Sequence, residues 1–324
     1  MIDRMIEDLR SGNKKTIVFP EGSDPRILEA ANRLAALNIL SPLLIGNEEE
    51  ILAAAKRADI NADGLRITSP DRFSDTERML SEMIKLRKGK MTEQECRETL
   101  KKSNYFGVML VKLGYADGLL GGATYSTADT VRPALQLVKT KPGNNIVSSS
   151  LIITRTTEAG KETYVMGDCA INVTPTEDEL VEITMETVAT ARIFSVDPKV
   201  ALLSYSTLGS AKGADVDKIR NAVKKLKEMN VDYPVDGELQ FDAALSPTVA
   251  GLKAPGSSVA GHANCFIFPD VASGNIGYKI AQRLGGFEAI GPILQGLNAP
   301  VNDLSRGCTA DEAFKMAVIT AALA

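Results

Sequence analysis

Apolar positions follow two alternating patterns along the chain. Short uninterrupted runs, such as residues 16–19 (TIVF) and 200–205 (VALLSY), have the length and composition of strands buried on both faces of a sheet. Between such runs lie longer segments, such as residues 216–229, in which apolar residues recur at helical spacing. Because strand and helix patterns alternate from end to end, we predict an α/β fold of parallel sheets with helices on both faces.

A polar stretch with Pro142 and Gly143, residues 139–144, separates two parts of this pattern. A chain of 324 residues is long enough for about two domains of ~150 residues each. Residues 291–300 have the composition of a loop that could lead the chain back to its first part. We therefore expect two doubly wound parallel-sheet domains, domain I of residues 1–142 plus 292–324 and domain II of residues 143–291.

Residues 302–312 carry the most informative polar pattern. Thr309, followed three positions later by Glu312 and then by an apolar run, is typical of a capping box at the start of a helix. Ser305 and Arg306 should therefore lie just before a helix N-terminus, where backbone N–H groups and the helix dipole attract anions. On these residues alone, an anion site competes with the commoner interpretation of a surface turn and an ordinary cap.

A second arginine is expected at a strand end near the N-terminus. Asp24 and Pro25 mark a helix start directly after the first predicted strand, which places Arg26 in the first helical turn. In an open α/β sheet the carboxyl ends of the strands form the edge that binds ligands. Arg26 could bind a ligand there, or it could pair with Glu21 or Glu29.

The turn after residues 118–120 combines a glycine pair with hydroxyl groups and Arg132. Glycines let the backbone approach a ligand closely, and hydroxyl and N–H groups bind ligand oxygens. The candidate binding residues of this turn are Thr124, Ser126 and Thr127. The alternative is a capped helix with an ion-paired arginine, and Pro133 requires that helix to kink or to begin nearby.

Composition limits the possible partners. The charge of 37 − 41 = −4 argues against broad nucleic-acid or membrane binding, which needs a basic surface. One histidine, His262, and four scattered cysteines form no zinc-site spacing, and His262 alone is weak evidence for a hydrolase triad. The charged N-terminal segment does not have the pattern of a secretion signal, and no apolar run reaches about 18 residues. We expect a cytoplasmic protein that needs no metal and binds neither nucleic acid nor membrane.

The motifs of several nucleotide and hydrolase folds are missing. No phosphate-binding P-loop, dinucleotide-binding glycine motif or nucleophile elbow occurs. Arginines instead stand near hydroxyl- and glycine-rich strand ends, and the arginine side chain binds phosphate and carboxylate through paired hydrogen bonds. The residues therefore predict an α/β protein that binds a small, phosphorylated, doubly anionic ligand between two domains.

An ordered set of motifs resembles one family. In sequence these are residues 129–134 (DTVRPA), 203–207 (LSYST), 236–240 (DGELQ), 254–257 (APGS), 274–276 (GNI) and 300–308 (PVNDLSRGC). Each motif is weak alone, but together they follow the order and spacing of phosphate acetyltransferases (phosphotransacetylases) along the whole chain.

The resemblance implies reversible acetyl transfer between acetyl phosphate and the thiol of coenzyme A (CoA). It implies two α/β domains with an active-site cleft between them, as in isocitrate and isopropylmalate dehydrogenases, and a homodimer, for which domain II is the expected contact. The substrates would be acetyl phosphate, phosphate and CoA or acetyl-CoA, with no tightly bound cofactor. A thiolate would attack the acetyl carbonyl directly in a ternary complex; an acyl intermediate on Cys308 is the less favoured alternative.

The resemblance also implies roles for particular residues. Ser305 and Arg306 would be catalytic, with Glu312 as the proposed base and Asp311 in reserve, because the family's aspartate falls at the position of Glu312. The arginines expected to hold phosphate and CoA are Arg26, Arg87 and Arg132. The remaining candidate binding residues are Thr124, Ser126, Thr127 and Asn275.

Other functions remain open from the sequence. A phosphate butyryltransferase would use the same chemistry with a larger apolar acyl site. A non-catalytic module that senses acetyl-CoA would keep binding without turnover. A dehydrogenase of the isocitrate type would need an aspartate cluster for a metal and a Lys/Tyr pair, which we do not find in the sequence.

Overall fold

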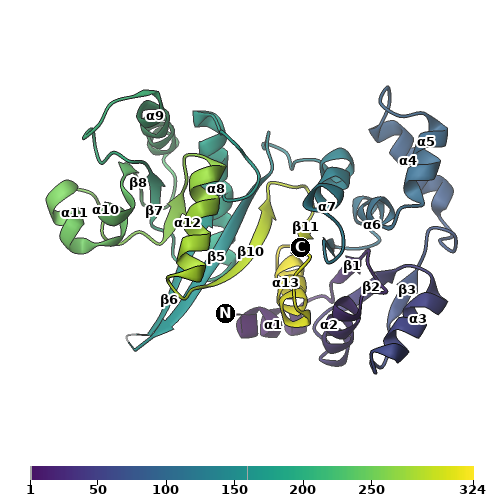
Figure 1. Cartoon of the computed structure of the whole chain (residues 1–324). Coiled ribbons are helices and arrows are strands. Elements are labelled where there is room, and N and C mark those ends of the chain that lie inside the picture. The colour runs from purple at the N-terminus through teal and green to yellow at the C-terminus, as the bar shows by residue number, and fades with distance from the viewer. Residues whose placement is uncertain (1, 159) are drawn as a thin grey trace. The chain divides into compact units, whose positions relative to one another are not determined.

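The computed structural model describes residues 2–158 and 160–324 (Figure 1). The chain forms two compact units, and each is described by itself. Unit 1 runs to Pro142 and includes Leu297–Ala324, and unit 2 is Gly143–Gly296. Residues 292–296, expected in the first domain, therefore belong to unit 2, and the chain returns to unit 1 a few residues later than expected.

Unit 1 contains a sheet of five parallel strands. Its order is β11-β4-β1-β2-β3, with β1 at Thr16–Phe19, β2 at Ser41–Ile45, β3 at Arg66–Thr68, β4 at Gly118–Gly121 and β11 at Val301–Asp303. The helices are α1 (Ile2–Ser11), α2 (Pro25–Ala36), α3 (Glu48–Arg57), α4 (Thr76–Leu86), α5 (Glu93–Leu100), α6 (Ser103–Lys112), α7 (Thr127–Pro133) and α13 (Ala310–Ala322). A π-helical turn, η1 (Ala134–Val138), continues α7 beyond Pro133. This irregular continuation agrees with the kink that the proline requires.

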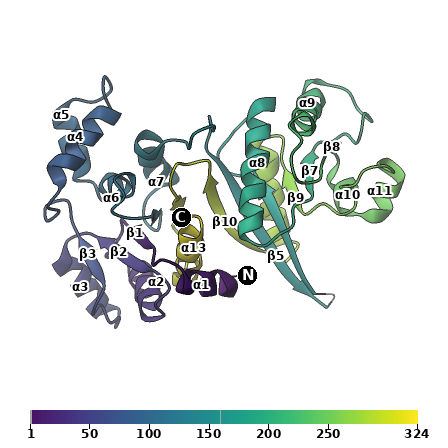
Figure 2. The same cartoon turned by 180° about the vertical axis from the view of Figure 1, so that it is seen from behind.

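Helices cover both faces of this sheet, as the continuous apolar strands predict. Val18 and Leu119 pack under Gly107 of α6, where an added Cβ would come within 2.8 Å of a Leu119 methyl group. On the opposite face Ile17 lies near Gly118 and Thr320 of α13. Figures 1 and 2 show α13 beside α1 and α2, so the last helix of the chain completes the layer begun by the first.

Unit 2 contains a mixed sheet of six strands in the order β10-β5-β6-β9-β7-β8. The strands are β5 (Ser148–Thr157), β6 (Gly160–Gly167), β7 (Val200–Leu203), β8 (Val235–Leu239), β9 (Cys265–Ile267) and β10 (Glu288–Gln295). β6, β9, β7 and β8 are parallel, whereas β5 pairs antiparallel with both β6 and β10. The α/β class is confirmed, and the sheet of unit 2 adds an antiparallel part to the expected parallel core.

The helices of unit 2 lie on both faces of its sheet. They are α8 (Glu177–Ile193), α9 (Ala214–Glu228), α10 (Phe241–Leu245), α11 (Pro247–Lys253) and α12 (Val271–Arg283). α8 packs against β5, β6 and β9, and α12 packs against β10, β5 and β6. Thr187 of α8 lies against Gly167, whereas Met166, the residue before it, belongs to the apolar cluster on the other face.

Two elements differ from the sequence expectation. Residues 291–295, interpreted as a loop, belong to β10, whose pairing with β5 is irregular between Ile290 and Ile293. A proline is tolerated at such an irregularity on an edge strand, so Pro292 does not prevent the strand. Helix α6 was not predicted because it is almost entirely buried and has no polar face to reveal its period.

The described residues contain no helix that is long and apolar enough to cross a membrane. Within the same residues, no group of three or more His, Cys, Asp and Glu side chains could hold a metal ion.

Candidate functional site

The carboxyl ends of β1, β4 and β11 meet at one edge of the sheet of unit 1. The strands are neighbours in the order β11-β4-β1 and run parallel, so the connections that follow them leave on the same side. These connections are residues 20–24, 122–126 and 304–309, and most of the candidate residues lie in or next to them. The sheet thus brings together segments that are far apart in the sequence.

Arg26 connects all three of these turns. Its Nε and Nη2 donate to the carboxylate of Asp24 at 3.0 and 2.8 Å, and Nη2 also donates to the Ala123 carbonyl at 2.8 Å. Its Nη1 donates to the carbonyls of Arg306 and Cys308 at 2.7 and 3.1 Å. A guanidinium has five N–H donors, so protein oxygens account for all of them. Arg26 therefore holds the turns together instead of offering free donors, and its ion-pair partner is Asp24, not Glu21 or Glu29.

Glu21 binds the backbone of the turn after β4. Its carboxylate accepts hydrogen bonds from the N–H groups of Ala123 at 3.0 Å and Tyr125 at 2.9 Å, and also from the N–H of Thr124. The Thr124 hydroxyl donates to the same carboxylate at 2.6 Å. Thr124, expected to bind a ligand, thus has both of its donors bound to a buried carboxylate of the protein.

Ser305 and Arg306 lie where the sequence predicts, just before α13. The Ser305 hydroxyl accepts a hydrogen bond from the Gly307 N–H at 3.3 Å, and the Ser305 carbonyl accepts one from the Cys308 N–H at 2.9 Å. Both side chains are exposed. Among the described residues no hydrogen bond or ion pair of the Arg306 guanidinium is found, while its carbonyl is held by Arg26. The turn is thus fixed through its backbone and presents an exposed hydroxyl and a cation.

The two candidate bases have different surroundings. Glu312 closes the predicted capping box: its carboxylate accepts from the Thr309 N–H at 2.7 Å, and the Thr309 hydroxyl accepts from the Glu312 N–H at 3.2 Å. Asp311 pairs with Lys315 at 3.1 Å and with Arg33 at 3.2 Å, and the hydrogen bond from Lys315 lowers its pKa. Two cations thus hold the Asp311 carboxylate, whereas Glu312 is held by its cap, which it would have to release to accept a proton.

The charges of Arg87 and Arg132 both influence the pKa of Tyr105. Burial raises the pKa of Tyr105, and the charges of Arg132 and Arg87 both oppose that shift. Arg132 is exposed, and within residues 2–158 and 160–324 we find no hydrogen bond to its guanidinium. Arg87 ends α4, and its buried Nε has no partner in the described residues. Two arginines without a carboxylate partner make a cationic area suited to phosphate groups.

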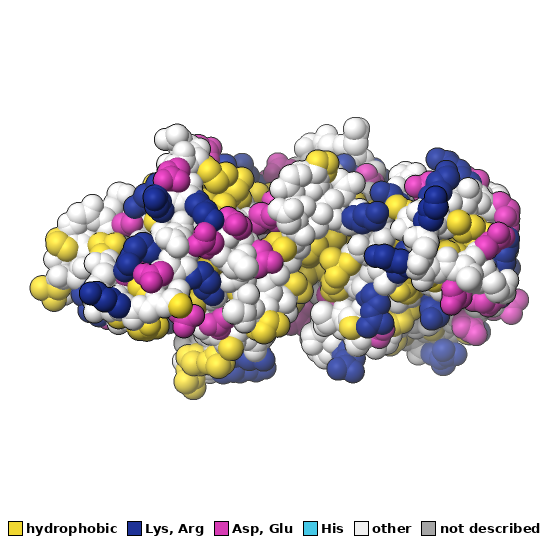
Figure 3. Space-filling view, turned by 90° about the horizontal axis from the view of Figure 1, so that it is seen from above, with side chains coloured by type: hydrophobic (Ala, Val, Ile, Leu, Met, Phe, Trp, Pro, Cys, Tyr) yellow, Lys and Arg dark blue, Asp and Glu magenta, His cyan; other side chains and the backbone are white. Residues whose placement is uncertain are grey.

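Positive side chains are also visible at the surface of this unit. In Figure 3, several Lys and Arg side chains (dark blue) lie on the face of unit 1 turned toward the viewer, and Asp and Glu side chains gather mainly at its rim. The net charge of −4 therefore does not prevent a local basic surface.

Ser126 and Thr127 begin α7. The Ser126 hydroxyl accepts from the Asp129 N–H at 3.2 Å and donates to the Asp129 carboxylate at 2.6 Å, which lowers the pKa of Asp129. Ser126 is therefore the helix cap, while Thr127 at the first helical position is exposed. Of the three hydroxyl residues predicted in this turn, Thr127 neither caps the helix nor binds Glu21, and its exposed side chain interacts with the carboxylate of Asp303.

Asp303 is a buried acid that sequence reasoning missed. It ends β11, is 4% exposed, and its Oδ1 has no hydrogen-bond partner among the described residues. Burial raises its pKa, partly opposed by the hydroxyls of Thr127 and Thr130. A Cβ at Gly122 would lie 2.3 Å from Asp303 Oδ1, so this glycine is required for the close approach of the two turns.

The remaining candidates have structural partners. Asn275 lies on α12 in unit 2, where its side-chain amide donates to the Cys169 carbonyl at 3.2 Å. Cys308 is 6% exposed, and burial raises the pKa of its thiol. A buried thiol with a raised pKa is a poor nucleophile, which argues against an acyl-cysteine.

Glu21, Tyr105 and Asp303 are the residues of this area that the sequence analysis did not select. Glu21 follows the predicted strand at residues 16–19 closely, which is a usable signal, whereas the strand that Asp303 ends was not predicted. The partners that distinguish both acids come from other parts of the sheet. Tyr105 lies on the unpredicted helix α6.

Comparison with known proteins identifies the family. Residues 1–321 match the family described as Phosphate acetyl/butaryl transferase, and the chain belongs to this family. It is 51% identical over 319 residues to the phosphate acetyltransferase of Bacillus subtilis (strain 168), covering 98% of each chain. It is 47% identical over 324 residues to that of Staphylococcus aureus (strain N315), covering 99% of this chain and 98% of the relative.

Solved structures give the same result. A phosphotransacetylase from Streptococcus pyogenes superposes with a TM-score of 0.94 at 51% identity, covering 99% of this chain and 98% of the other. The EutD phosphotransacetylase from Staphylococcus aureus gives a TM-score of 0.91 at 46% identity, covering 99% and 97%. A putative 4-hydroxythreonine-4-phosphate dehydrogenase from Salmonella typhimurium, at 12% identity and a TM-score of 0.55, shares the fold alone. The family resemblance and the dehydrogenase-like architecture are confirmed.

Proposed function

We propose that this chain is a phosphate acetyltransferase that transfers acetyl reversibly between acetyl phosphate and CoA. The observation that carries the proposal is the 51% identity to a phosphate acetyltransferase over 98% of both chains. The family includes butyryl enzymes by its description, but both close relatives described above are named for acetyl. No observation favours the butyryl or the sensing function.

Chemistry at this site needs a thiolate, a stabilised carbonyl oxygen and a phosphate leaving group. The thiol of CoA loses its proton, the sulfur attacks the acetyl carbon, and the bond from that carbon to the phosphate oxygen breaks. Ser305 and the free guanidinium of Arg306 are the groups we assign to the developing negative charge, since electrostatic stabilisation is usually the largest catalytic contribution. Phosphate is a fair leaving group, so positioning without a covalent enzyme intermediate suffices.

Glu312 is the proposed proton acceptor. The thiol proton would pass to its carboxylate when Thr309 releases it from the capping box. Asp311 is the weaker candidate because two cations hold its carboxylate.

Arg87 and Arg132 are proposed to bind phosphate groups of the substrates. Both arginine charges act on the pKa of Tyr105, and the buried Nε of Arg87 has no partner in the described residues, whereas the donors of Arg26 are all bonded. Thr127 is the best placed of the hydroxyl candidates, with Ser126 and Thr124 supporting the turn. Asn275 in unit 2 stays a predicted binding residue.

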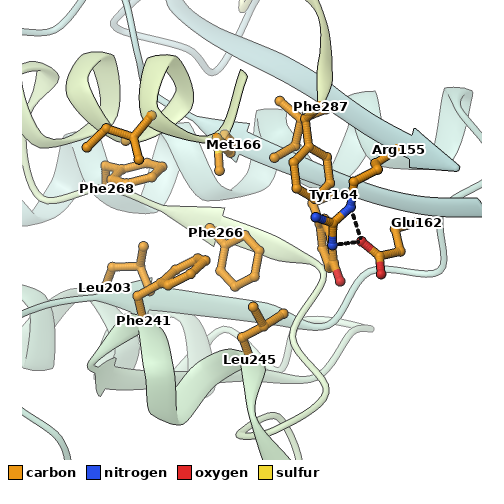
Figure 4. Close-up of a pocket in the computed structure, with 14 residues that line it drawn as sticks. Arg155, Glu162, Tyr164, Met166, Leu203, Phe241, Leu245, Phe266, Phe268 and Phe287 are labelled. Atoms are coloured by element: carbon orange, nitrogen blue, oxygen red, sulfur yellow. Dashed lines mark hydrogen bonds and ion pairs between the residues drawn. The ribbon is translucent and has the colours of Figure 1, made fainter. Parts of the chain in front are cut away.

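Self-association through unit 2 is proposed as well. The exposed side chains of Ile276 and Ile280 on α12 and of Leu284, the residue that ends it, follow one another at intervals of four and form one apolar face. Beside it lies a cavity of about 550 Å³, lined chiefly by aromatic and aliphatic side chains (Figure 4). An apolar helix face next to an apolar cavity suits a second copy related by twofold symmetry. We place the homodimer in the cytoplasm, where its four free buried thiols stay reduced.

One experiment tests the function and the site together. The purified protein is mixed with acetyl phosphate and CoA without added metal, and thioester formation is followed by absorbance, with butyryl phosphate in parallel. We expect acetyl transfer that falls by about 100-fold or more in Arg306→Ala, with a large loss in Ser305→Ala as well. Arg57→Ala, an exposed arginine at the end of α3, is the matched control. CoA binding without turnover would instead support the sensing module, and faster butyryl transfer would support the butyryltransferase.

A further inference from the structure

The turn after β4 already contains an anion supplied by the protein. The N–H groups of Ala123, Thr124 and Tyr125 and the Thr124 hydroxyl all point to the Glu21 carboxylate. Successive N–H groups in a turn form the kind of site that binds a phosphate in other α/β proteins. Here those donors are satisfied internally, so a substrate phosphate finds no free backbone donor at these positions.

Glu21 is well placed to hold this turn rigidly. It follows β1 directly and is 8% exposed, and hydrogen bonds to a charged carboxylate are stronger than neutral ones. In a mostly buried site the carboxylate depends on these donors, because an unpaired buried charge is costly. The interaction therefore fixes both the acid and the turn.

Arg26 links the turn that Glu21 binds to the turn of Ser305 and Arg306. Its Nη2 donates to the Ala123 carbonyl, on the opposite side of the peptide backbone that Glu21 binds, and its Nη1 donates to the Arg306 carbonyl. Glu21 and Arg26 thus hold residues 123–125 from their N–H and C=O groups, and Arg26 carries the restraint on to residues 306–308. Thr127 follows this turn after two residues, and the Arg306 side chain extends from the restrained backbone.

We propose that Glu21 is a positioning residue for acyl transfer, an internal anion that replaces substrate phosphate in the turn after β4 and fixes the groups that act on the substrate. The proposal rests on the assignment of Ser305 and Arg306 to the active site. Because the Glu21 carboxylate already occupies the backbone donors, the substrate's phosphate is directed toward the arginine side chains.

Chemical rescue tests this role. Glu21→Ala removes the carboxylate and leaves its donors lining a space that a small carboxylate can enter. We expect kcat to fall by about 100-fold, as for other losses of alignment near a reacting group, with a smaller change in KM. Sodium formate should restore kcat in a saturable manner, while sodium chloride at equal ionic strength should not. Glu21→Gln fills the space and removes one hydrogen bond, because its amide NH2 cannot accept from a backbone N–H, so its kcat should be low and formate should not restore it.

The controls separate this inference from the proposed site. Glu49→Ala, an exposed glutamate on α3, should behave as the unchanged protein with and without formate. If folded Glu21→Ala keeps its kcat, or if formate fails to restore it, Glu21 is not an internal anion of this kind. If Glu21→Ala does not fold, Glu21→Gln decides, and an unchanged kcat there overturns the proposal. Ser305→Ala is measured in the same assay: if it retains full turnover, the proposed site is wrong whatever the Glu21 variants do.

Discussion

Both units are layered α/β structures, but unit 1 presents polar turns at one sheet edge, whereas unit 2 presents exposed apolar side chains. In unit 1 every strand is parallel, and the carboxyl ends of β1, β4 and β11 bring three turns to one edge. Those turns carry exposed polar groups above a layer of buried charged ones. In unit 2 the antiparallel strands β5 and β10 extend the sheet, and α12 covers it while leaving apolar side chains exposed.

The charged side chains have different partners in the two units. In unit 1 the acids Glu21 and Asp24 take up backbone donors and Arg26, whereas Arg87, Arg132 and Arg306 have no carboxylate partner among the described residues. In unit 2, Arg155 at the cavity is paired with Glu162 at 2.7 Å. Arg155 also lies over the ring of Phe287 (Figure 4). Unpaired cations indicate a site for anionic substrates, and paired charges beside apolar surface indicate packing against protein.

The largest expected effect is at the proposed base in unit 1. Glu312→Gln should lower kcat by about 100-fold or more, because a general base contributes that much and the amide cannot accept the thiol proton. Asp311→Asn, next to it, should change kcat little, since its carboxylate is paired with Lys315 and Arg33. Steady-state kinetics of both variants, with thermal unfolding to check the lost cap, make the measurement. The reverse pattern would show that Asp311 is the base.

The cationic area should contribute next. Arg132→Ala and Arg87→Ala should each raise KM for CoA or acetyl phosphate by about 10-fold, the value of a charge-assisted hydrogen bond. The fold should be unaffected, because neither side chain has an ion pair within the described part of the chain. Arg155→Ala in unit 2 is the contrasting variant: it should lower stability and leave KM nearly unchanged. Unchanged KM in Arg132→Ala would remove this residue from the site.

The apolar face of unit 2 predicts an effect on assembly. Ile280→Asp puts a charge into the stripe formed with Ile276 and Leu284, so light scattering should report monomers where the unchanged protein forms dimers. Leu252, 82% exposed on α11 and outside the stripe, provides the control variant Leu252→Asp, which should stay dimeric. A monomeric unchanged protein, or a dimeric Ile280→Asp, would contradict the proposed interface.

The smallest expected effect concerns Asp303 and pH. Its folded-state pKa is raised by burial, so its contribution to stability is complete below the ordinary value of 3.8 and is lost as the pH rises through the folded value. Asp303→Asn should therefore be more stable than the unchanged protein at neutral pH, by about 1 kcal/mol, because the neutral amide removes a buried charge. The difference should shrink toward pH 4.

Asp311 provides the opposite sign for the same measurement. Its pKa is lowered by Lys315, so its contribution to stability is present above the ordinary value and is lost as the pH falls through the folded value. Asp311→Asn should be slightly less stable at neutral pH, by well under about 1 kcal/mol because the pair is exposed. Urea unfolding of both variants across this pH range makes the comparison, and equal signs for the two would contradict it.

Local signals were enough for several elements of the fold and the site. The capping box at Thr309 could be predicted because it depends on two residues three positions apart, and it is present. Asp24 caps α2 as predicted for the same reason. The place of Ser305 and Arg306 before α13 followed directly from the Thr309 cap.

Hydrogen bonds between residues far apart in the sequence could not be predicted. The sequence places Arg26 at a strand end, but its acceptors are the carbonyls of residues 123, 306 and 308, which only the order β11-β4-β1 brings within reach. For this reason a predicted ligand-binding arginine proved to be fully bonded within the protein. The predicted ligand-binding residue Thr124 is likewise bound within the protein, by the carboxylate of Glu21.

The sequence by itself determined the alternation of strands and helices and the place of Ser305 and Arg306 before a helix, because these depend on residues close together in the chain. It also determined the family, because the order and spacing of short motifs can be compared without the fold. The tertiary structure alone decided which arginines keep free donors, which acids are buried and how the strands of unit 2 pair. These properties follow from hydrogen bonds and burial between separate segments of the chain, and Glu21 and residues 123–125 are more than a hundred residues apart.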